Sequence, residues 1–135
     1  MEDKKTLGSL NNMGIVLHHM EDYEGALAYY QQALRVMEKV MRKTHPSTLD
    51  TIMNIAGAYM EGLKDFMKAE KITRLALDGY ERSLGKDHEN TKNCARNLAI
   101  LYVDSLGSKV KLQYLVNDYP HVPSSMNGAT DLLNT

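Results

Sequence analysis

Three asparagines, Asn12, Asn54 and Asn97, recur along the chain at intervals of 42 and 43 residues. A carboxamide both donates and accepts hydrogen bonds, so a row of them can bind the main chain of a peptide whatever its sequence. The simpler alternative is that each bonds to its own backbone near a helix end. Each lies two residues before a small residue that lets another helix approach closely: Gly14, Ala56 and Ala99.

The histidines and the single cysteine are the next candidates for chemistry. Zinc needs three or four ligands that converge on one point, but His18 and His19 diverge by about 100° on a helix. His45 and His88 lie 43 residues apart at matching corners, where helix capping and packing are the expected roles. Cys94 has no second cysteine to pair with, and we predict a buried structural thiol. We therefore expect neither a metal site nor a cofactor.

Catalytic motifs are missing from the sequence. It contains no glycine-rich phosphate loop, no serine-centred nucleophile elbow and no HExxH zinc motif. The acidic residues are scattered over helix faces that we expect to be solvent-exposed. The sequence therefore predicts a protein without enzymatic activity.

The 135 residues include 16 basic and 17 acidic side chains, which gives a net charge of −1. This balance argues against a broad electrostatic surface for nucleic acid or for anionic membranes. No apolar run approaches the roughly 20 residues of a membrane-spanning helix, and the charged start at residues 2–5 is not a secretory signal. We expect a cytoplasmic protein whose nine methionines mostly fill gaps in a helical core.

Apolar residues recur at steps of three and four, which is typical of helices with one buried face. Asp22 and Asp65 are suited to helix starts, and Gly62 and Gly85 lie where helices should end. The expected helices span residues 6–19, 22–42, 47–62, 65–84 and 88–104, with a weaker sixth at 108–117. Because both halves of the pattern keep the same period, the helices should form repeated pairs.

Alanines occupy matching positions in the second helix of each pair: Ala26 with Ala69, and Ala33 with Ala76. Together with Tyr59 and Tyr102, which follow the small residues of the first helices, this pattern resembles the tetratricopeptide repeat, usually about 34 residues long. The longer period and the segments 30–41 and 83–91 are similar to the kinesin-light-chain class of these repeats. The resemblance implies an all-α solenoid of about two and a half repeats.

The resemblance also implies where a partner binds. In this family the matching asparagine faces a concave groove and bonds to the main chain of a bound peptide. The residues implied here are the three asparagines and their preceding neighbours: Asn12, Asn54, Asn97, Asn11, Met53 and Arg96. The sequence departs from the pattern at Glu89, which replaces Pro46, and at Thr73, which replaces Tyr30. The third unit also lacks a recognisable long second helix.

We expect one helical repeat domain over residues 1–117 and a flexible tail over 118–135. Its units are expected at about 6–47, 48–90 and 91–117. The predicted function is a non-enzymatic scaffold that binds a peptide or a partner protein, as a cargo or adaptor module does. The alternative is a structural module that forms a homodimer through an open C-terminal end, unless a short helix at 109–117 covers that end. The sequence leaves open whether the chain is complete or part of a longer array.

Overall fold

The computed structural model describes residues 2–122, with side chains from residue 7 onwards. Six α-helices and two short π-helical turns occupy this stretch, and it contains no strand. They are α1 (Glu2–His19), α2 (Tyr23–Val40), α3 (Pro46–Gly57), η1 (Ala58–Gly62), α4 (Phe66–Leu84), α5 (Glu89–Ile100), η2 (Leu101–Leu106) and α6 (Lys109–Asp118). The predicted all-α architecture is confirmed, including its sixth helix.

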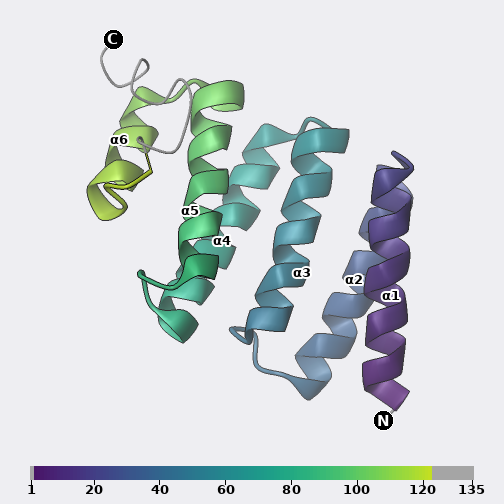
Figure 1. The fold of residues 1–135 in the computed structure, drawn as a ribbon. Helices are drawn as coiled ribbons and strands as arrows, with labels where there is room; N and C mark the ends of the chain where they lie inside the picture. Colours follow the sequence, from purple (N-terminus) through teal and green to yellow (C-terminus); the bar gives the residue numbers. More distant parts are fainter. Residues whose placement is uncertain (1, 123–135) are drawn as a thin grey trace.

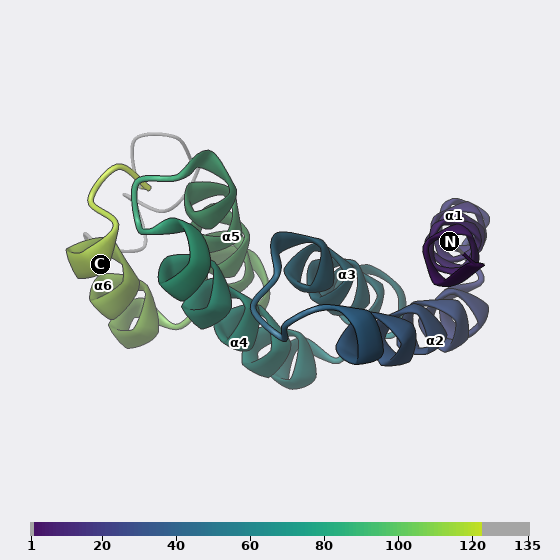
Figure 2. The ribbon, with the colours of Figure 1, turned by 90° about the horizontal axis from the view of Figure 1, so that it is seen from below.

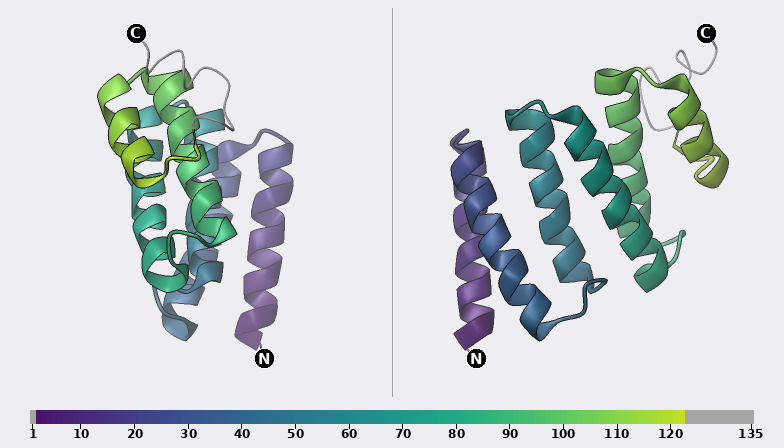
Figure 3. Two further views of the ribbon diagram at one scale, coloured as in Figure 1. Left: turned by 60° about the vertical axis from the view of Figure 1, so that its left-hand side comes forward. Right: turned by 180° about the vertical axis from the view of Figure 1, so that it is seen from behind.

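The helices form antiparallel pairs that stack along one direction (Figure 1). α1, α3 and α5 lie in one layer and α2 and α4 in the other, and the stack curves with the first layer on its inner side (Figure 2). Each of α2 and α4 packs against the first helix of its own pair and against the first helix of the next pair. α1 and α6 lie at opposite ends of the stack (Figure 3).

Small residues let the paired helices approach closely. The four alanines of the second helices are all at most 1% exposed, as predicted: Ala26, Ala33, Ala69 and Ala76. At Gly14, an added Cβ atom would lie 2.5 Å from Cε1 of Tyr30. A residue with a side chain at this position would push α2 away from α1, so the close approach depends on glycine.

The second helices begin at residues that share one register. Asp22, Asp65 and Ser108 are 43 residues apart, and each accepts with its side chain the backbone N–H three residues later, at 3.0, 3.2 and 3.3 Å. The residue before each cap has a left-handed φ between 55° and 64°: Glu21, Lys64 and Gly107. α6 is therefore the second helix of the third repeat, shortened but in register.

Matching corners precede α3 and α5. Nδ1 of His45 accepts the N–H of Ser47, and Nδ1 of His88 accepts the N–H of Asn90, both at 3.1 Å. The predicted capping role of these two histidines is confirmed. The residue after each histidine is a proline in one corner and a glutamate in the other, and both suit the first turn of a helix.

The π-helical turns account for the difference between the 42- and 43-residue intervals. In the first unit the N–H of Asp22 bonds to the carbonyl of Leu17, five residues back, at 2.8 Å. In the second unit the N–H of Asp65 bonds to the carbonyl of Tyr59, six residues back, at 2.9 Å, and the third unit repeats this arrangement at 3.0 Å. Leu17 and Tyr59 are repeat-equivalent, so one extra residue is taken up in η1 and another in η2.

The sulfur-containing side chains agree with the predictions only in part. Cys94 is 2% exposed, and burial, with a smaller contribution from the charge of Glu81, raises the pKa of its thiol to about 12. It is an unreactive structural thiol, as predicted. Met37 is buried as well. The expectation that methionines fill the core is wrong for three exposed ones: Met13, Met20 and Met67.

The packed part of the chain extends beyond residue 117. Tyr119 and Val122 are 2% and 0% exposed, although both belong to the segment predicted as a flexible tail. The hydroxyl of Tyr119 donates to the carboxylate of Glu81 on α4, and Nζ of Lys86 lies 5.8 Å from the centre of its ring. The packed domain therefore includes residues 118–122, and the remainder of the predicted tail lies outside the described residues.

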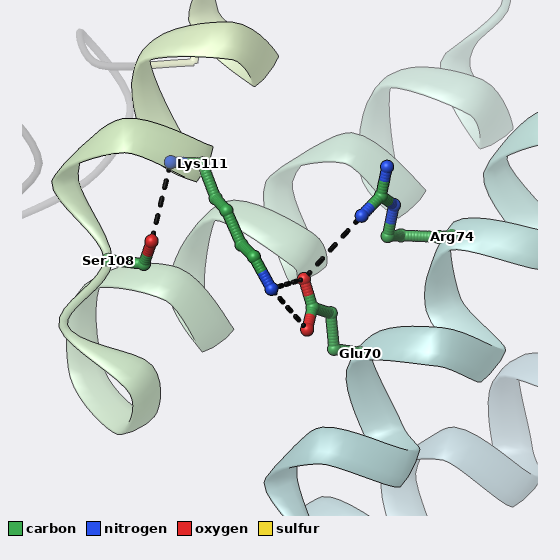
Figure 4. Close-up of polar contacts among 4 residues, drawn as sticks. All are labelled: Glu70, Arg74, Ser108 and Lys111. Carbon is green, nitrogen blue, oxygen red and sulfur yellow. Dashed lines mark hydrogen bonds and ion pairs between the residues drawn. The ribbon is translucent and has the colours of Figure 1, made fainter.

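A buried carboxylate joins α6 to α4 (Figure 4). Glu70 of α4 is 4% exposed, and its two oxygens accept hydrogen bonds from Nζ of Lys111 on α6 at 3.0 and 2.9 Å. Arg74, one turn further along α4, lies 3.8 Å from the same carboxylate. Leu112 and Leu115 on the inner face of α6 are 0% and 7% exposed. Of the two outcomes expected for the C-terminal end, the structure shows the docked helix.

We expect the docking of α6 to weaken in acid. Burial alone would raise the pKa of Glu70, but hydrogen bonds from Lys111 and Tyr102 and the charges of Lys111 and Arg74 outweigh it and lower the pKa below 4.5. A carboxylate whose pKa is lower in the folded state contributes stability above its unfolded-state pKa and loses it as the pH falls through the folded-state value. Urea unfolding at a series of pH values from about 6 to 3 should show this loss.

The variant Glu70→Leu is the control for this pH dependence. It places at position 70 the residue type that the first repeat has at the equivalent Leu27. The free energy of unfolding of this variant should fall less steeply below pH 4.5 than that of the wild type. Equal slopes for the two proteins would show that other carboxylates cause the acid sensitivity.

Candidate peptide-binding groove

A hollow of about 450 Å³ opens between α1 and α3 on the inner side of the solenoid. Its floor is formed by Tyr30 of α2 and Thr73 of α4, and Asn97 of α5 also contributes to it. Its walls come from α1 on one side and from α3 and η1 on the other: Ile15, His18 and His19, opposite Met53, Asn54, Gly57, Met60 and Glu61. We call this hollow, with its lining residues, the inner groove.

The inner groove is open because a small residue lies at its wall. An added Cβ at Gly57 would meet only Cε1 of His18, at 3.7 Å. Below this gap Tyr30 is 2% exposed, and burial together with the charge of Glu61 raises the pKa of its phenol. The groove therefore combines aliphatic and thioether walls with a floor that includes a neutral phenol, an environment suited to an apolar side chain.

Two side-chain contacts link α1 to the neighbouring pair along this groove. Nε2 of His18 lies 2.9 Å from Oε2 of Glu61, and the imidazole packs edge-on against Tyr23 with a ring separation of 5.2 Å. The hydroxyl of Thr51 donates to Oδ1 of Asn11 at 3.4 Å. These contacts fix the spacing between the walls while leaving the space between them unfilled.

A smaller hollow of about 180 Å³ continues the inner groove along α3 and α5. It shares Met53 and Asn97 with the larger one and adds Asp50, Asn93 and Tyr80. The hydroxyl of Tyr80 donates to the carboxylate of Asp50, so this carboxylate already has a partner. The lining of the two hollows together is rich in amides and carries little unpaired charge.

The predicted binding residues separate into two groups in the structure. Asn54, Asn97 and Met53 line the inner groove together. The other three do not line it. Asn12 is exposed on α1, Asn11 is bonded to Thr51, and Arg96 pairs with Glu89 at 3.3 Å. The binding role of all six stays a prediction, and the geometry favours the first three.

Sequence reasoning missed His18, Glu61 and Tyr30 as groove residues. His18 lies six residues after Asn12, and Glu61 seven after Asn54, so each lies about two helical turns from an asparagine already singled out. Extending each asparagine by two turns would have identified this rim. The floor residue Tyr30 was recognised only as a packing position.

A larger hollow of about 630 Å³ lies between α2 and α4 on the outer side. Leu34, Ile55, Ile72 and Leu75 contribute to its mostly aliphatic lining. Its equivalent in the next repeat lies between α4 and α6 and measures about 290 Å³. Because it recurs with the stacking of the second helices and brings few polar groups together, we regard it as a packing feature.

Metal ligands do not cluster in the described part of the chain. Residues 2–122 contain no group of three or more histidine, cysteine, aspartate or glutamate side chains placed to hold a metal ion. No helix within the same range is both long enough and apolar enough to span a membrane.

Stacked helix pairs with an amide-lined inner groove define an α-helical repeat scaffold of the kind that mediates protein interactions. The family model of the tetratricopeptide repeat matches residues 5–62 and 48–107, which is most of the chain. The chain belongs to the tetratricopeptide repeat family, and the predicted resemblance is confirmed. No match to it is found among curated proteins.

Solved structures of kinesin-light-chain-type repeats share the fold. BtubC (BKLC) from P. vanneervenii superposes with a TM-score of 0.75 at 17% identity, covering 90% of this chain and 47% of that chain. A Podosopora anserina protein assigned as a kinesin light chain, with nearly identical TPR-like repeats, gives 0.69 at 18% identity over 90% of this chain and 56% of that one. A form of the same protein with one substitution gives 0.70 at 19% identity, over 88% and 55%. This chain thus spans about half the length of each.

Proposed function

We propose that this protein is a non-enzymatic adaptor that binds an extended peptide, or an unfolded segment of a partner protein, in the inner groove. The observation that carries the proposal is the meeting of two repeat-equivalent amides, Asn54 and Asn97, with apolar walls in one hollow. Amides that recur with the repeat match the regular spacing of main-chain groups along an extended peptide. The hollow beside them can take one apolar side chain of the same peptide.

Each part of the groove has a distinct task in this proposal. The carboxamides of Asn54 and Asn97 pair with the N–H and C=O groups of the peptide. An apolar peptide side chain enters between α1 and α3, against Met53 and above Tyr30. The resulting specificity is for an extended backbone with one apolar anchor, and the salt dependence of binding should be weak because few charges are unpaired.

The likeness of the fold to kinesin-light-chain repeats suggests the class of partner. We propose a cargo or adaptor peptide of the kind that such light chains connect to other proteins. This step rests on the similarity of the fold, whereas the binding mode rests on the inner groove.

Replacing Asn54 by alanine should weaken peptide binding by about 5–100-fold. The change leaves one peptide main-chain group without its hydrogen-bond partner, which costs about 1–3 kcal/mol. The probe is a peptide selected on the wild-type chain from a displayed library of unstructured sequences, labelled for fluorescence polarisation. The far-ultraviolet circular dichroism of the variant should match that of the wild type.

Asn117→Ala is the matched control, because Asn117 is an exposed asparagine on α6, away from the inner groove. It should bind the selected peptide with the wild-type affinity. Asn12→Ala provides a second comparison, since Asn12 shares the repeat register but lines neither hollow. Wild-type affinity for Asn54→Ala would overturn the groove assignment.

A further inference from the structure

The N-terminal end of the solenoid exposes an apolar stripe. Met13, Val16 and Met20 on α1 are 44%, 50% and 70% exposed. In the repeat register the first two correspond to residues that are at most 7% exposed against the preceding second helix: Ile55, Ala58, Leu98 and Leu101. The same helix face is thus a buried interface twice within the chain, and on α1 nothing among residues 2–122 covers it.

The opposite end is closed by a polar surface. α6 is the last second helix, and Lys109 and Gln113 are its positions equivalent to those with which α4 faces α5. Both side chains are exposed to solvent. Covering them with Met13 and Val16 of another copy would remove water from an ammonium and an amide without providing partners. A head-to-tail stack of copies is therefore disfavoured.

We propose that the outer face of α1, formed by Ser9, Met13, Val16 and Met20, pairs with the same face of a second copy in an antiparallel, two-fold dimer. The spacing of these residues, four, three and four, is the same in both directions along the helix. Antiparallel pairing therefore sets Met13 against the partner's Val16 and Met20 against the partner's Ser9. At each end a large side chain meets a small one, so the helices can approach closely.

The dimer extends an interface that the chain already uses. α2 covers this face of α3, and α4 covers it on α5; in the dimer, α1 of each copy covers it on the other. Three partly exposed side chains on each copy give an area below the roughly 1,200 Å² of a stable complex. The dimer is therefore weak, and its population depends strongly on protein concentration.

Analytical ultracentrifugation between about 1 µM and 1 mM tests the proposal. The wild type should shift from monomer to dimer and form nothing larger. Val16→Glu should raise the dissociation constant at least 10-fold, with an unchanged circular dichroism spectrum because position 16 is half-exposed. Val110→Glu, at an equally exposed apolar residue of α6, should associate like the wild type.

A wild type that stays monomeric over this range overturns the proposal, as does a Val16→Glu variant that still dimerises normally. Loss of association in Val110→Glu would instead show that α6 takes part, and growth beyond the dimer would indicate head-to-tail stacking. Each of these results excludes the two-fold pairing through α1.

Disulfide trapping tests the antiparallel register directly. Ser9 and Met20 are separated by about 16 Å along α1. A mixture of Ser9→Cys and Met20→Cys chains should form a disulfide-linked dimer on mild oxidation, whereas neither variant alone should do so. The native Cys94 is buried and does not compete. Linkage of Met20→Cys to itself would indicate a parallel pair, and failure of the mixture to link would also contradict the proposal.

Discussion

Replacing Lys111 by methionine should destabilise the C-terminal part of the solenoid by about 2–4 kcal/mol. Methionine keeps much of the apolar stem of lysine but removes the ammonium, so the buried Glu70 carboxylate retains only Arg74, at 3.8 Å. Removing one partner of a fully buried pair costs about 3–5 kcal/mol, because the other charge stays desolvated. The lower range applies here because the Lys111 side chain is 41% exposed. Urea unfolding measures the loss, and hydrogen exchange should show it first in α6.

The double variant Glu70→Leu with Lys111→Met separates the charge from the packing. It gives this interface an apolar residue where the first repeat has the equivalent Leu27. Apolar replacement of a whole buried pair is often neutral or stabilising, so the double variant should unfold within about 1 kcal/mol of the wild type. A double variant as unstable as Lys111→Met alone would contradict the explanation by a stranded carboxylate. Wild-type stability of the single variant would contradict it too.

Enlarging Ala76 to leucine should cost about 1–3 kcal/mol. Ala76 is 0% exposed and lies in the core cluster that contains Leu49 and Tyr80. Three added carbon atoms have no space there, so α4 must shift away from α3 or the leucine must adopt a strained rotamer. For a domain of this size the loss should lower the thermal midpoint by several degrees.

Ala28→Leu is the matched control for this substitution. It makes the same chemical change on α2 at a position that faces solvent, so its effect should stay within about 0.5 kcal/mol. An unchanged melting temperature for Ala76→Leu would show that the helices of the second pair are not in close contact at this alanine.

The sequence predicts the repeat because its physical causes are local. Caps, small residues and apolar periodicity each depend on a few neighbouring positions, and Asp22, Asp65 and the two corner histidines show them clearly. The third second helix was harder to recognise, since Ser108 replaces aspartate at its cap and Pro120 follows soon after its end. Only the constant 43-residue register connects this helix with the earlier two.

The candidate site was predictable in part for a similar reason. Repetition pointed to Asn54 and Asn97, but the inner groove between α1 and α3 depends on tertiary spacing around Gly57. The ion pair of His18 with Glu61 joins positions that are not equivalent in the repeat, since Glu61 corresponds to His19. Such cross-register contacts arise from how the pairs stack, and a comparison of aligned repeats does not reveal them.

The π-helical turns η1 and η2 also have a consequence for how such arrays can evolve. Each absorbs one inserted residue in the final turn of a first helix, and the next cap still bonds to the repeat-equivalent carbonyl. An insertion or deletion at this point changes the winding of one turn and leaves the neighbouring interfaces in place. Units of 42 and 43 residues can therefore be duplicated, exchanged or recombined within one gene without dislocating the stack.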